Sequence, residues 1–404
     1  MKIGIVTTWY ERGAAYVSRQ YADVLRDNND IYIYSRGSKS EIGDEWLGEN
    51  IHIAKNSFIP ITCSIHRKDF INWIVHNKIE CIFFNEQQWW PPVLWARELG
   101  VKVGAYIDYY TEQTIPLFAS YDFLICNTKK HYQAFNWHPQ AYYVPWGTDI
   151  NLFKPTTSTS VEEDKVTFFN SAGYNPHRKG TDLVIKAFSK LSGNAKLIIH
   201  TQIDLITVFP EMKNLIEGLI IDGGIQVIKE TVTAPGLYHL GDVFVQPSRL
   251  EGIGLPAAEA LSCGLPFITS NKAPMNEFFT PAAGMLADIE KEYSRSDGYY
   301  WPVCEVNIDS LSKCMLFYIN NVENLRQYKN NARQHAVDKL NWHSNADKIN
   351  EHFHHAQILK VDIKQLIWAY EDQRKTFLVV LSQKNAFLGR IGRKLYTVFN
   401  IPVK

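Results

Sequence analysis

Residues 245–269 read VQPSRLEGIGLPAAEALSCGLPFIT and contain the strongest folding signal in the chain. Apolar runs at 242–245 and 265–270 are typical of short buried strands. Between them, the glycine-rich turn 251–254 leads into a helix, because proline suits a first helical position and glycine commonly follows a helix end. The stretch therefore predicts a strand, a turn, a helix and a second strand, with Glu259 in the first turn of the helix.

The same turn has the chemistry of an anion site. Backbone N–H groups and the positive end of the helix dipole favour phosphate at such a turn. Two carboxylates, Glu251 and Glu259, frame it. A carboxylate beside a phosphate site is suited to hold sugar or ribose hydroxyls, because an ionised carboxylate only accepts hydrogen bonds. The alternative is that Glu259 complements the helix dipole and that Glu251 is a solvated loop charge.

Residues 251–266 resemble the Glu-x7-Glu signature of family 4 glycosyltransferases, which are retaining enzymes of the GT-B fold. The resemblance implies an α/β chain of two Rossmann-like domains whose parallel sheets face a central cleft. It places Glu259 on the ribose hydroxyls and Glu251 on the sugar hydroxyls of a nucleotide diphosphate sugar. The N–H groups near Gly254 and Leu255 are expected to bind the diphosphate.

A second basic turn lies at 172–181, between a predicted strand at 166–171 and an amphipathic helix at 182–191. Arg178 and Lys179 lie side by side there, which suits a diphosphate at the carboxyl edge of a sheet. In the family, this region has a glycine, an arginine directly after it and a lysine five residues later. Gly173 and Lys179 occupy the glycine and lysine positions, but Tyr174 replaces the arginine, so we expect Arg178 to supply its charge. The alternative is a solvated turn.

The first half alternates predicted strands and helices, which indicates a Rossmann-like domain with a parallel sheet. Gly13 precedes the first helix and would let a ligand approach the backbone. Polar clusters follow the strand ends, where ligands of parallel sheets bind. The family often has a histidine after the strand expected at 103–107; Asp108 is there instead, and we expect it to touch the donor sugar. Solvated loops are the alternative. The predicted strands are 2–7, 31–35, 81–85, 103–107, 123–126 and 141–144.

A chain of 404 residues favours two domains over one core. We expect an N-terminal acceptor-side domain at 1–155, a polar linker at 156–165, a nucleotide-sugar-binding domain at 166–344, and at 345–404 a helix crossing back followed by a basic amphipathic tail. Residues 384–404 contain five basic residues and no acidic one. This pattern is typical of peripheral membrane contact, or of a helix packed on the first domain.

Composition excludes other classes. Lys+Arg and Asp+Glu are equal at 42 each, so no net charge favours nucleic acid. The six cysteines have no metal-ligand spacing and indicate a reduced, cytoplasmic protein. No apolar run is long enough to span a bilayer, so we expect a cytoplasmic protein, with peripheral contact at the inner face of the cell membrane as an option. No Asp-x-Asp pair suggests a metal, and we expect no cofactor beyond a donor such as a UDP- or GDP-sugar.

The function expected from these features is retaining transfer of a hexosyl unit to a hydroxyl of a growing glycan, such as a cell-surface polysaccharide or a lipid-linked saccharide. Two alternatives remain: a GT-B nucleotide-sugar hydrolase or epimerase, and a non-catalytic nucleotide-sugar-binding protein. A dinucleotide dehydrogenase is disfavoured because the first strand-loop-helix lacks Gly-x-Gly-x-x-Gly.

Overall fold

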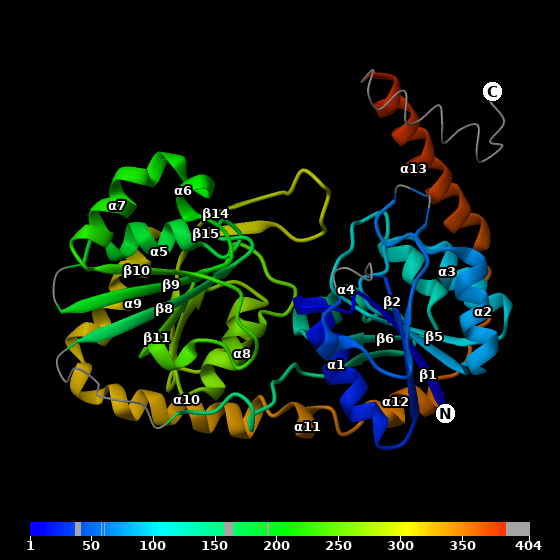
Figure 1. The fold of residues 1–404 in the computed structure, drawn as a ribbon, viewed down its shortest axis with the longest axis horizontal. Helices are drawn as coiled ribbons and strands as arrows, with labels where there is room; N and C mark the ends of the chain where they lie inside the picture. Colours follow the sequence, from blue (N-terminus) through cyan, green and yellow to red (C-terminus); the bar gives the residue numbers. More distant parts are fainter. Residues whose placement is uncertain (37–41, 58, 60, 157–164, 192–193, 385–404) are drawn as a thin grey trace.

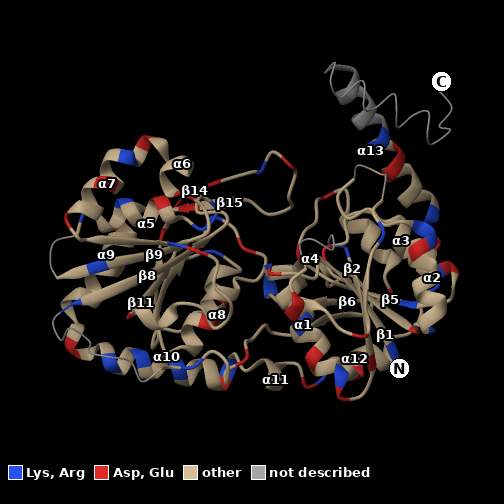
Figure 2. Cartoon of the chain, in the orientation of Figure 1, with Lys and Arg blue, Asp and Glu red and all other residues tan. Residues whose placement is uncertain are grey.

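The computed structural model describes residues 1–36, 42–57, 59, 61–156, 165–191 and 194–384. They form two Rossmann-like α/β domains, each built on a parallel sheet flanked by helices (Figure 1). Acidic and basic side chains are spread over both domains (Figure 2).

The first domain contains a sheet of seven strands in the order β3-β2-β1-β4-β5-β6-β7, and neighbouring strands are parallel. Central strands such as β4 and β6 are buried along their whole length, because helices cover both faces of a parallel sheet. The strands are β1 (Lys2–Thr7), β2 (Asp30–Ser35), β3 (Ile51–Ile53), β4 (Cys81–Phe84), β5 (Lys102–Tyr106), β6 (Phe123–Cys126) and β7 (Ala141–Tyr143). The helices are α1 (Gly13–Arg26), α2 (Arg67–Asn77), α3 (Pro91–Glu98) and α4 (Lys129–Phe135).

The second domain contains a six-stranded parallel sheet in the order β10-β9-β8-β11-β12-β13. Its central strands β8 and β11 are followed by the two turns that the sequence analysis singled out. The strands are β8 (Val166–Gly173), β9 (Ala195–Thr201), β10 (Ile225–Lys229), β11 (Val243–Gln246), β12 (Phe267–Ser270) and β13 (Gly284–Ala287). The helices are α5 (Thr181–Phe188), α6 (Leu205–Val208), α7 (Lys213–Ile221), α8 (Leu255–Ser262) and α9 (Ile308–Asn320).

An antiparallel hairpin, β14 (Ile289–Tyr293) and β15 (Val303–Val306), extends from the second domain toward the first (Figure 1). Its loop docks on the first domain, where Thr111 and Tyr299 form an isolated antiparallel bridge. The Tyr300 N–H donates to the Tyr110 carbonyl at 3.0 Å. The sequence analysis did not predict this hairpin.

The C-terminal helices return to the first domain. They are α10 (Leu325–Lys339), α11 (Trp342–Asn345), α12 (Ile349–His355) and α13 (Lys364–Lys384), and they lie along the lower edge of Figure 1 before α13 projects upward. Trp342 is buried, and its Nε1–H donates to the Gln20 carbonyl at 3.0 Å. Most of the predicted linker, 157–164, and the predicted basic tail after residue 384 lie outside the described residues. Among the described helices, none is long and apolar enough to cross a membrane.

One local expectation is wrong. Helix α8 begins at Leu255, and its first turn contains no acidic residue. Glu259 is therefore in the second turn, where the helix dipole acts on it less.

Candidate active site

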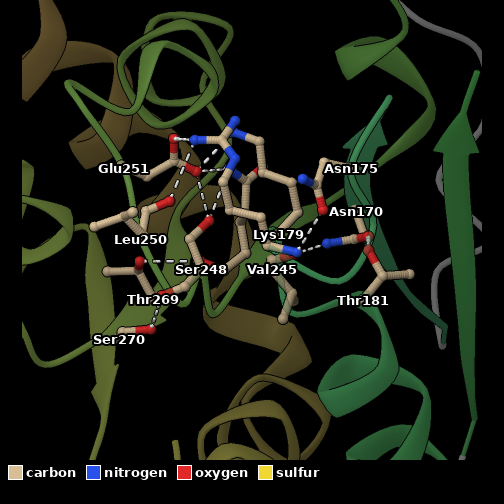
Figure 3. Close-up of polar contacts among 12 residues, drawn as sticks. Asn170, Asn175, Lys179, Thr181, Val245, Ser248, Leu250, Glu251, Thr269 and Ser270 are labelled. Atoms are coloured by element: carbon tan, nitrogen blue, oxygen red, sulfur yellow. Dashed lines mark hydrogen bonds and ion pairs between the residues drawn. The ribbon is translucent and has the colours of Figure 1, made fainter. Parts of the chain in front are cut away.

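Glu251 is the centre of a buried charge cluster in the turn between β11 and α8. Its side chain is 5% exposed. Oε1 accepts hydrogen bonds from Lys179 Nζ at 2.6 Å and Ser248 Oγ at 2.7 Å, and Oε2 accepts one from Arg178 Nη1 at 3.1 Å (Figure 3). The structure thus brings together three of the predicted site residues, one from the turn after β11 and two from the turn after β8.

These contacts keep Glu251 ionised. Burial alone would raise the pKa of the carboxyl, but the positive charges of Arg178 and Lys179 outweigh it and lower the pKa to about 2. Burial lowers the pKa of Lys179, and the charge of Glu251 offsets part of that effect. The cluster therefore contains a carboxylate with two cationic partners in a water-poor site.

The turn that carries Arg178 and Lys179 is fixed by a buried arginine that the sequence analysis missed. Arg249 is 4% exposed and binds Asp182 through two contacts, Nη1–Oδ1 at 2.7 Å and Nη2–Oδ2 at 2.8 Å. Nη1 also donates to the His177 carbonyl at 2.6 Å, and the backbone N–H of Arg249 donates to the Arg178 carbonyl at 2.8 Å. The carbonyls of His177 and Arg178 are thereby both bonded to Arg249, which belongs to the segment after β11 that also carries Glu251. These bonds fix the backbone of the turn next to the two cations.

Gly180 completes this turn. Its φ of +70° is in the left-handed region, and a Cβ there would lie 2.2 Å from the Pro247 carbonyl oxygen. Only glycine fits such a close backbone approach. The turns after β8 and β11 therefore touch directly, which places Lys179 against Glu251.

Glu259 lies deeper along α8 and faces a cleft of about 600 Å³ between the two domains. Burial raises its pKa, with Tyr238 and Lys179 opposing the shift, and the Tyr238 hydroxyl donates to Glu259 Oε2. The cleft is lined by residues of both domains, including Tyr16, Asp149, His200, Leu255 and Glu259. This size is within the usual range for a small-molecule site.

Two predicted binding glycines flank this cleft from opposite domains. Gly13 begins α1, and a Cβ there would lie 3.8 Å from Leu255 Cδ1, so the first-domain loop meets the first residue of α8. Gly254, which precedes α8, has φ of +93°. The structure thus brings Gly13 close to Leu255, which follows Gly254 in the chain and lines the cleft.

Two first-domain side chains link the docked hairpin to the Glu251 turn. The Trp301 Nε1–H donates to Tyr110 Oη, so this oxygen acts as an acceptor toward the tryptophan. The Tyr110 hydroxyl proton is then donated to His131 Nδ1, and the distance from Oη to Nδ1 is 2.9 Å. His131 Nε2 then carries the proton and donates to the Gly252 carbonyl at 3.0 Å. Burial and the nearby Lys130 lower the pKa of His131 to about 3, so it stays neutral. No sequence motif indicated this relay.

The structure does not bring Asp108 into the cluster. Among the contacts of the described residues, no hydrogen bond or ion pair joins it to Arg178, Lys179 or Glu251. It lies half-buried after β5, where burial and then the charge of Glu86 raise its pKa. Its expected contact with the donor sugar stays a prediction.

The position at which the family has an arginine is occupied by Tyr174 and lies on the surface. Gly173 ends β8 with φ of +56°, and Tyr174 is 58% exposed. Arg178, not residue 174, makes the ion pair with Glu251. Within the described part of the chain, no group of three or more His, Cys, Asp or Glu side chains is arranged to hold a metal ion.

Residues 156–335 match the model of the family described as "Glycosyl transferases group 1". This stretch, which is less than half of the chain, is similar to glycosyltransferase group 1 domains. The match covers both turns of the charge cluster, so the cluster lies within the matched domain.

Two curated relatives are mannosyltransferases. The GDP-mannose-dependent monoacylated alpha-(1-6)-phosphatidylinositol monomannoside mannosyltransferase of Corynebacterium glutamicum is 25% identical over 236 residues, covering 50% of this chain and 55% of the relative. The MMP alpha-(1->4)-mannosyltransferase of Mycolicibacterium hassiacum is 25% identical over 211 residues, covering 51% and 46%. The chain thus spans about half the length of the curated relatives it matches.

A solved glycosyltransferase from Rickettsia africae has the same fold, with a TM-score of 0.69 over 88% of this chain and 99% of that one, at 15% identity. At this identity the likeness shows the fold alone. The fold is GT-B, which confirms the expected fold class.

Proposed function

We propose that the protein is a retaining glycosyltransferase that transfers a hexosyl unit from a nucleotide diphosphate sugar to a hydroxyl of a growing glycan. The observation that carries the proposal is the cluster of the buried Glu251 and Lys179 with the partly exposed Arg178, just before α8 and within the stretch that matches the group 1 family. The printed names of the two relatives, both mannosyltransferases and one GDP-mannose-dependent, support a hexosyl donor of this kind.

In the proposed reaction, Lys179 and Arg178 bind the donor diphosphate together with the N–H groups of Gly254 and Leu255. Negative charge grows on the diphosphate as the bond to the sugar breaks, and preorganised cations stabilise it best in a water-poor site. Both cations now contact Glu251, so the phosphate oxygens would take over part of these contacts. Glu251, which stays ionised, then has acceptor positions for the sugar hydroxyls.

The nucleoside is proposed to lie in the 600 Å³ cleft, with its ribose hydroxyls on Glu259. Tyr238 orients this carboxyl from one side, which leaves the other oxygen for the ribose. No metal ion is required in this scheme, because the leaving charge is met by side-chain cations and backbone N–H groups. Gly173 is proposed to let the diphosphate approach the backbone after β8.

The acceptor is proposed to be a cell-surface polysaccharide or a lipid-linked saccharide, bound against the first domain. The name of the Corynebacterium relative, which acts on a phosphatidylinositol mannoside, supports a lipid-linked acceptor. We propose that the protein acts in the cytoplasm, in peripheral contact with the inner face of the cell membrane through residues 384–404.

The first test is thermal stabilisation by UDP, GDP, ADP and CMP. A nucleotide at 100 times its dissociation constant stabilises a protein by about 2.7 kcal/mol. We expect one nucleoside diphosphate to stabilise the wild type and the control Glu217→Ala, whose residue is half-exposed on α7, but to stabilise Glu259→Ala much less. The matching nucleotide sugars are then offered with mannosides and lipid-linked saccharides, and released nucleotide and the anomeric configuration of the product are measured.

Each result separates the candidates. Release of nucleotide only when acceptor is present, with retained configuration, supports the proposal. Release without acceptor would indicate the hydrolase. Nucleotide binding with no release under any condition would indicate a non-catalytic binding protein, and no stabilisation by any nucleotide would overturn all three.

A further inference from the structure

A second pocket, of about 500 Å³, lies where the hairpin loop, the first domain and α13 meet. We call it the hairpin pocket. It is separate from the cleft that contains Glu259, and the two share no lining residue. Its walls include Gln88, Tyr109, Gln113, Asp297, Tyr370 and Arg374. Four segments that are distant in sequence, 87–90, 109–118, 296–298 and 370–374, therefore build one concave site.

The hairpin wall is held against the first domain by several contacts. The rings of Tyr109 and Tyr299 stack with centroids 5.4 Å apart. The Tyr109 hydroxyl donates to the Asp297 carbonyl at 3.3 Å, and Tyr299 pairs with Thr111 in the antiparallel bridge. This wall is therefore fixed by both side-chain and backbone contacts.

Helix α13 is the opposite wall, and its position is set by a buried carboxyl. Glu371 is fully buried and accepts a hydrogen bond from the Trp90 N–H at 3.1 Å. Arg374 donates to the Gln88 carbonyl at 2.7 Å, and Ile367 is also fully buried. These contacts fix the two side chains that α13 contributes to the pocket, Tyr370 and Arg374.

The lining has the chemistry of a site for neutral sugars. Aromatic side chains provide flat apolar faces with polar tips, and glutamine amides provide both donors and acceptors for hydroxyls. Among the lining residues that the structure describes, Arg374 is the one cation, and its guanidinium is already bonded to Gln88 and Glu371. Glu112 and Asp297 are acidic. An anionic ligand is therefore disfavoured relative to a neutral one.

The hairpin also connects this pocket to the proposed donor site. Tyr299 and Trp301 follow the pocket residues Asp297 and Gly298, and Trp301 begins the relay through Tyr110 and His131 to Gly252. Gly252 is adjacent to Glu251. A ligand in the hairpin pocket is thus held by the same loop that is bonded to the turn of the charge cluster.

We propose that the hairpin pocket binds a neutral sugar residue of the acceptor glycan, and that this sugar residue lies between the hairpin of the second domain and α13. This inference rests on the proposed function, because it names a subsite of the acceptor for that reaction. Both walls come from segments that lie late in the chain, so the pocket forms only when the hairpin and α13 are docked.

The test measures binding of neutral manno-, gluco- and galacto-disaccharides by saturation-transfer NMR to the full chain, with glucose 1-phosphate as the anionic probe. We expect at least one disaccharide to bind, and Gln113→Ala to weaken binding by about threefold to tenfold, the loss typical of one hydrogen bond. Tyr109→Ala should weaken binding at least as much, because it also removes the ring stacking on Tyr299 and the hydrogen bond to the Asp297 carbonyl that hold the hairpin wall. Gln113 is exposed, so its substitution leaves the fold intact. The matched control Gln334→Ala, on exposed surface of α10, should bind as the wild type does.

Thermal stabilisation by nucleotide is measured on the same samples and should be equal in the wild type, Gln113→Ala and Gln334→Ala, because the donor cleft shares no lining residue with the hairpin pocket. Absence of disaccharide binding, equal binding by Gln113→Ala, Tyr109→Ala and the wild type, or preferential binding of glucose 1-phosphate at this pocket would each overturn the inference. Failure of all nucleotides to stabilise the wild type would refute the proposed function instead, and the disaccharide result would still decide the pocket.

Discussion

Replacing Arg249 tests whether its side chain holds the turn of Arg178 and Lys179 in place, as the structure indicates. The Arg249→Met substitution keeps an extended apolar side chain but leaves the carboxylate of Asp182, which is 8% exposed, without its two-contact partner. Removal of one partner from a buried ion pair costs about 3–5 kcal/mol, because an uncompensated charge stays buried. We expect the free energy of unfolding to fall by about that amount.

The assay is urea unfolding followed by circular dichroism, with nucleotide binding measured on the same samples. Lys190→Met is the control, since Lys190 and Asp309 also form a short ion pair, 2.6 Å, but with side chains 52% and 69% exposed. Such an exposed pair contributes about 0–1 kcal/mol. Nucleotide affinity should also fall in Arg249→Met alone, because the carbonyl of His177, which precedes Arg178, loses its hydrogen bond from the Arg249 side chain.

The double variant Arg249→Met/Asp182→Leu distinguishes the effect of the unpaired Asp182 charge from the other effects of losing the Arg249 side chain. With both charges gone, no unpaired carboxylate stays at position 182, and we expect much of the lost stability to return, except the part due to the His177 carbonyl and Glu305, which also lose their contacts with Arg249. The reasoning would be refuted if Arg249→Met cost no more than Lys190→Met. It would also be refuted if the double variant were as unstable as the single one, because the unpaired charge would then not be the cause.

Three further predictions follow from the same site. Gly180→Ala should cost more than about 2 kcal/mol in urea unfolding, because its backbone is left-handed and a Cβ would lie 2.2 Å from the Pro247 carbonyl oxygen. Lys179→Met should weaken the nucleoside diphosphate by about 10- to 100-fold in calorimetric titration, because it removes a charged hydrogen-bond donor beside Glu251. Between pH 6.5 and 3, the unfolded chain binds a proton at His131 that the folded chain does not bind. The free energy of unfolding should therefore fall as the pH falls, by about 2 kcal/mol from pH 6.5 to 5. His131→Gln should make the free energy of unfolding depend less on pH in this range.

Each of these has a result that contradicts it. A Gly180→Ala protein with an unchanged urea midpoint would mean that the turn can shift. Unchanged nucleotide affinity in Lys179→Met would remove Lys179 from the diphosphate site. For His131, the exposed His343→Gln is the control, and equal pH slopes in both variants would show that another group causes the acid sensitivity.

The sequence predicted most of the parallel sheets because their strands are continuous apolar runs. The turn after β11 leads into a helix as expected. The hairpin was not predictable in the same way. Residues of β14 such as Lys291 and Glu292 are exposed, and the loop is positioned by contacts with Tyr110, nearly two hundred positions away.

The candidate site was predictable in its residue types but not in its pairings. The Glu-x7-Glu spacing and the adjacent cations indicated Glu251, Arg178 and Lys179, but not that all three touch in this structure. Arg249 carried no signal, because its partner Asp182 is 67 positions away and belongs to another turn. The roles assigned to Asp108, Gly13 and Gly173 depend on a ligand and stay predictions.

The two segments that join the domains run side by side. Thr148, which leaves the first domain, forms a parallel bridge with Asn341, which returns to it. The Thr148 N–H donates to the Leu340 carbonyl at 2.7 Å, and the Trp342 N–H donates to the Thr148 carbonyl at 3.1 Å. Because the two connections are bonded to each other, a rotation of one domain against the other about this pair would leave these bonds intact, whereas sliding one connection past the other would break them.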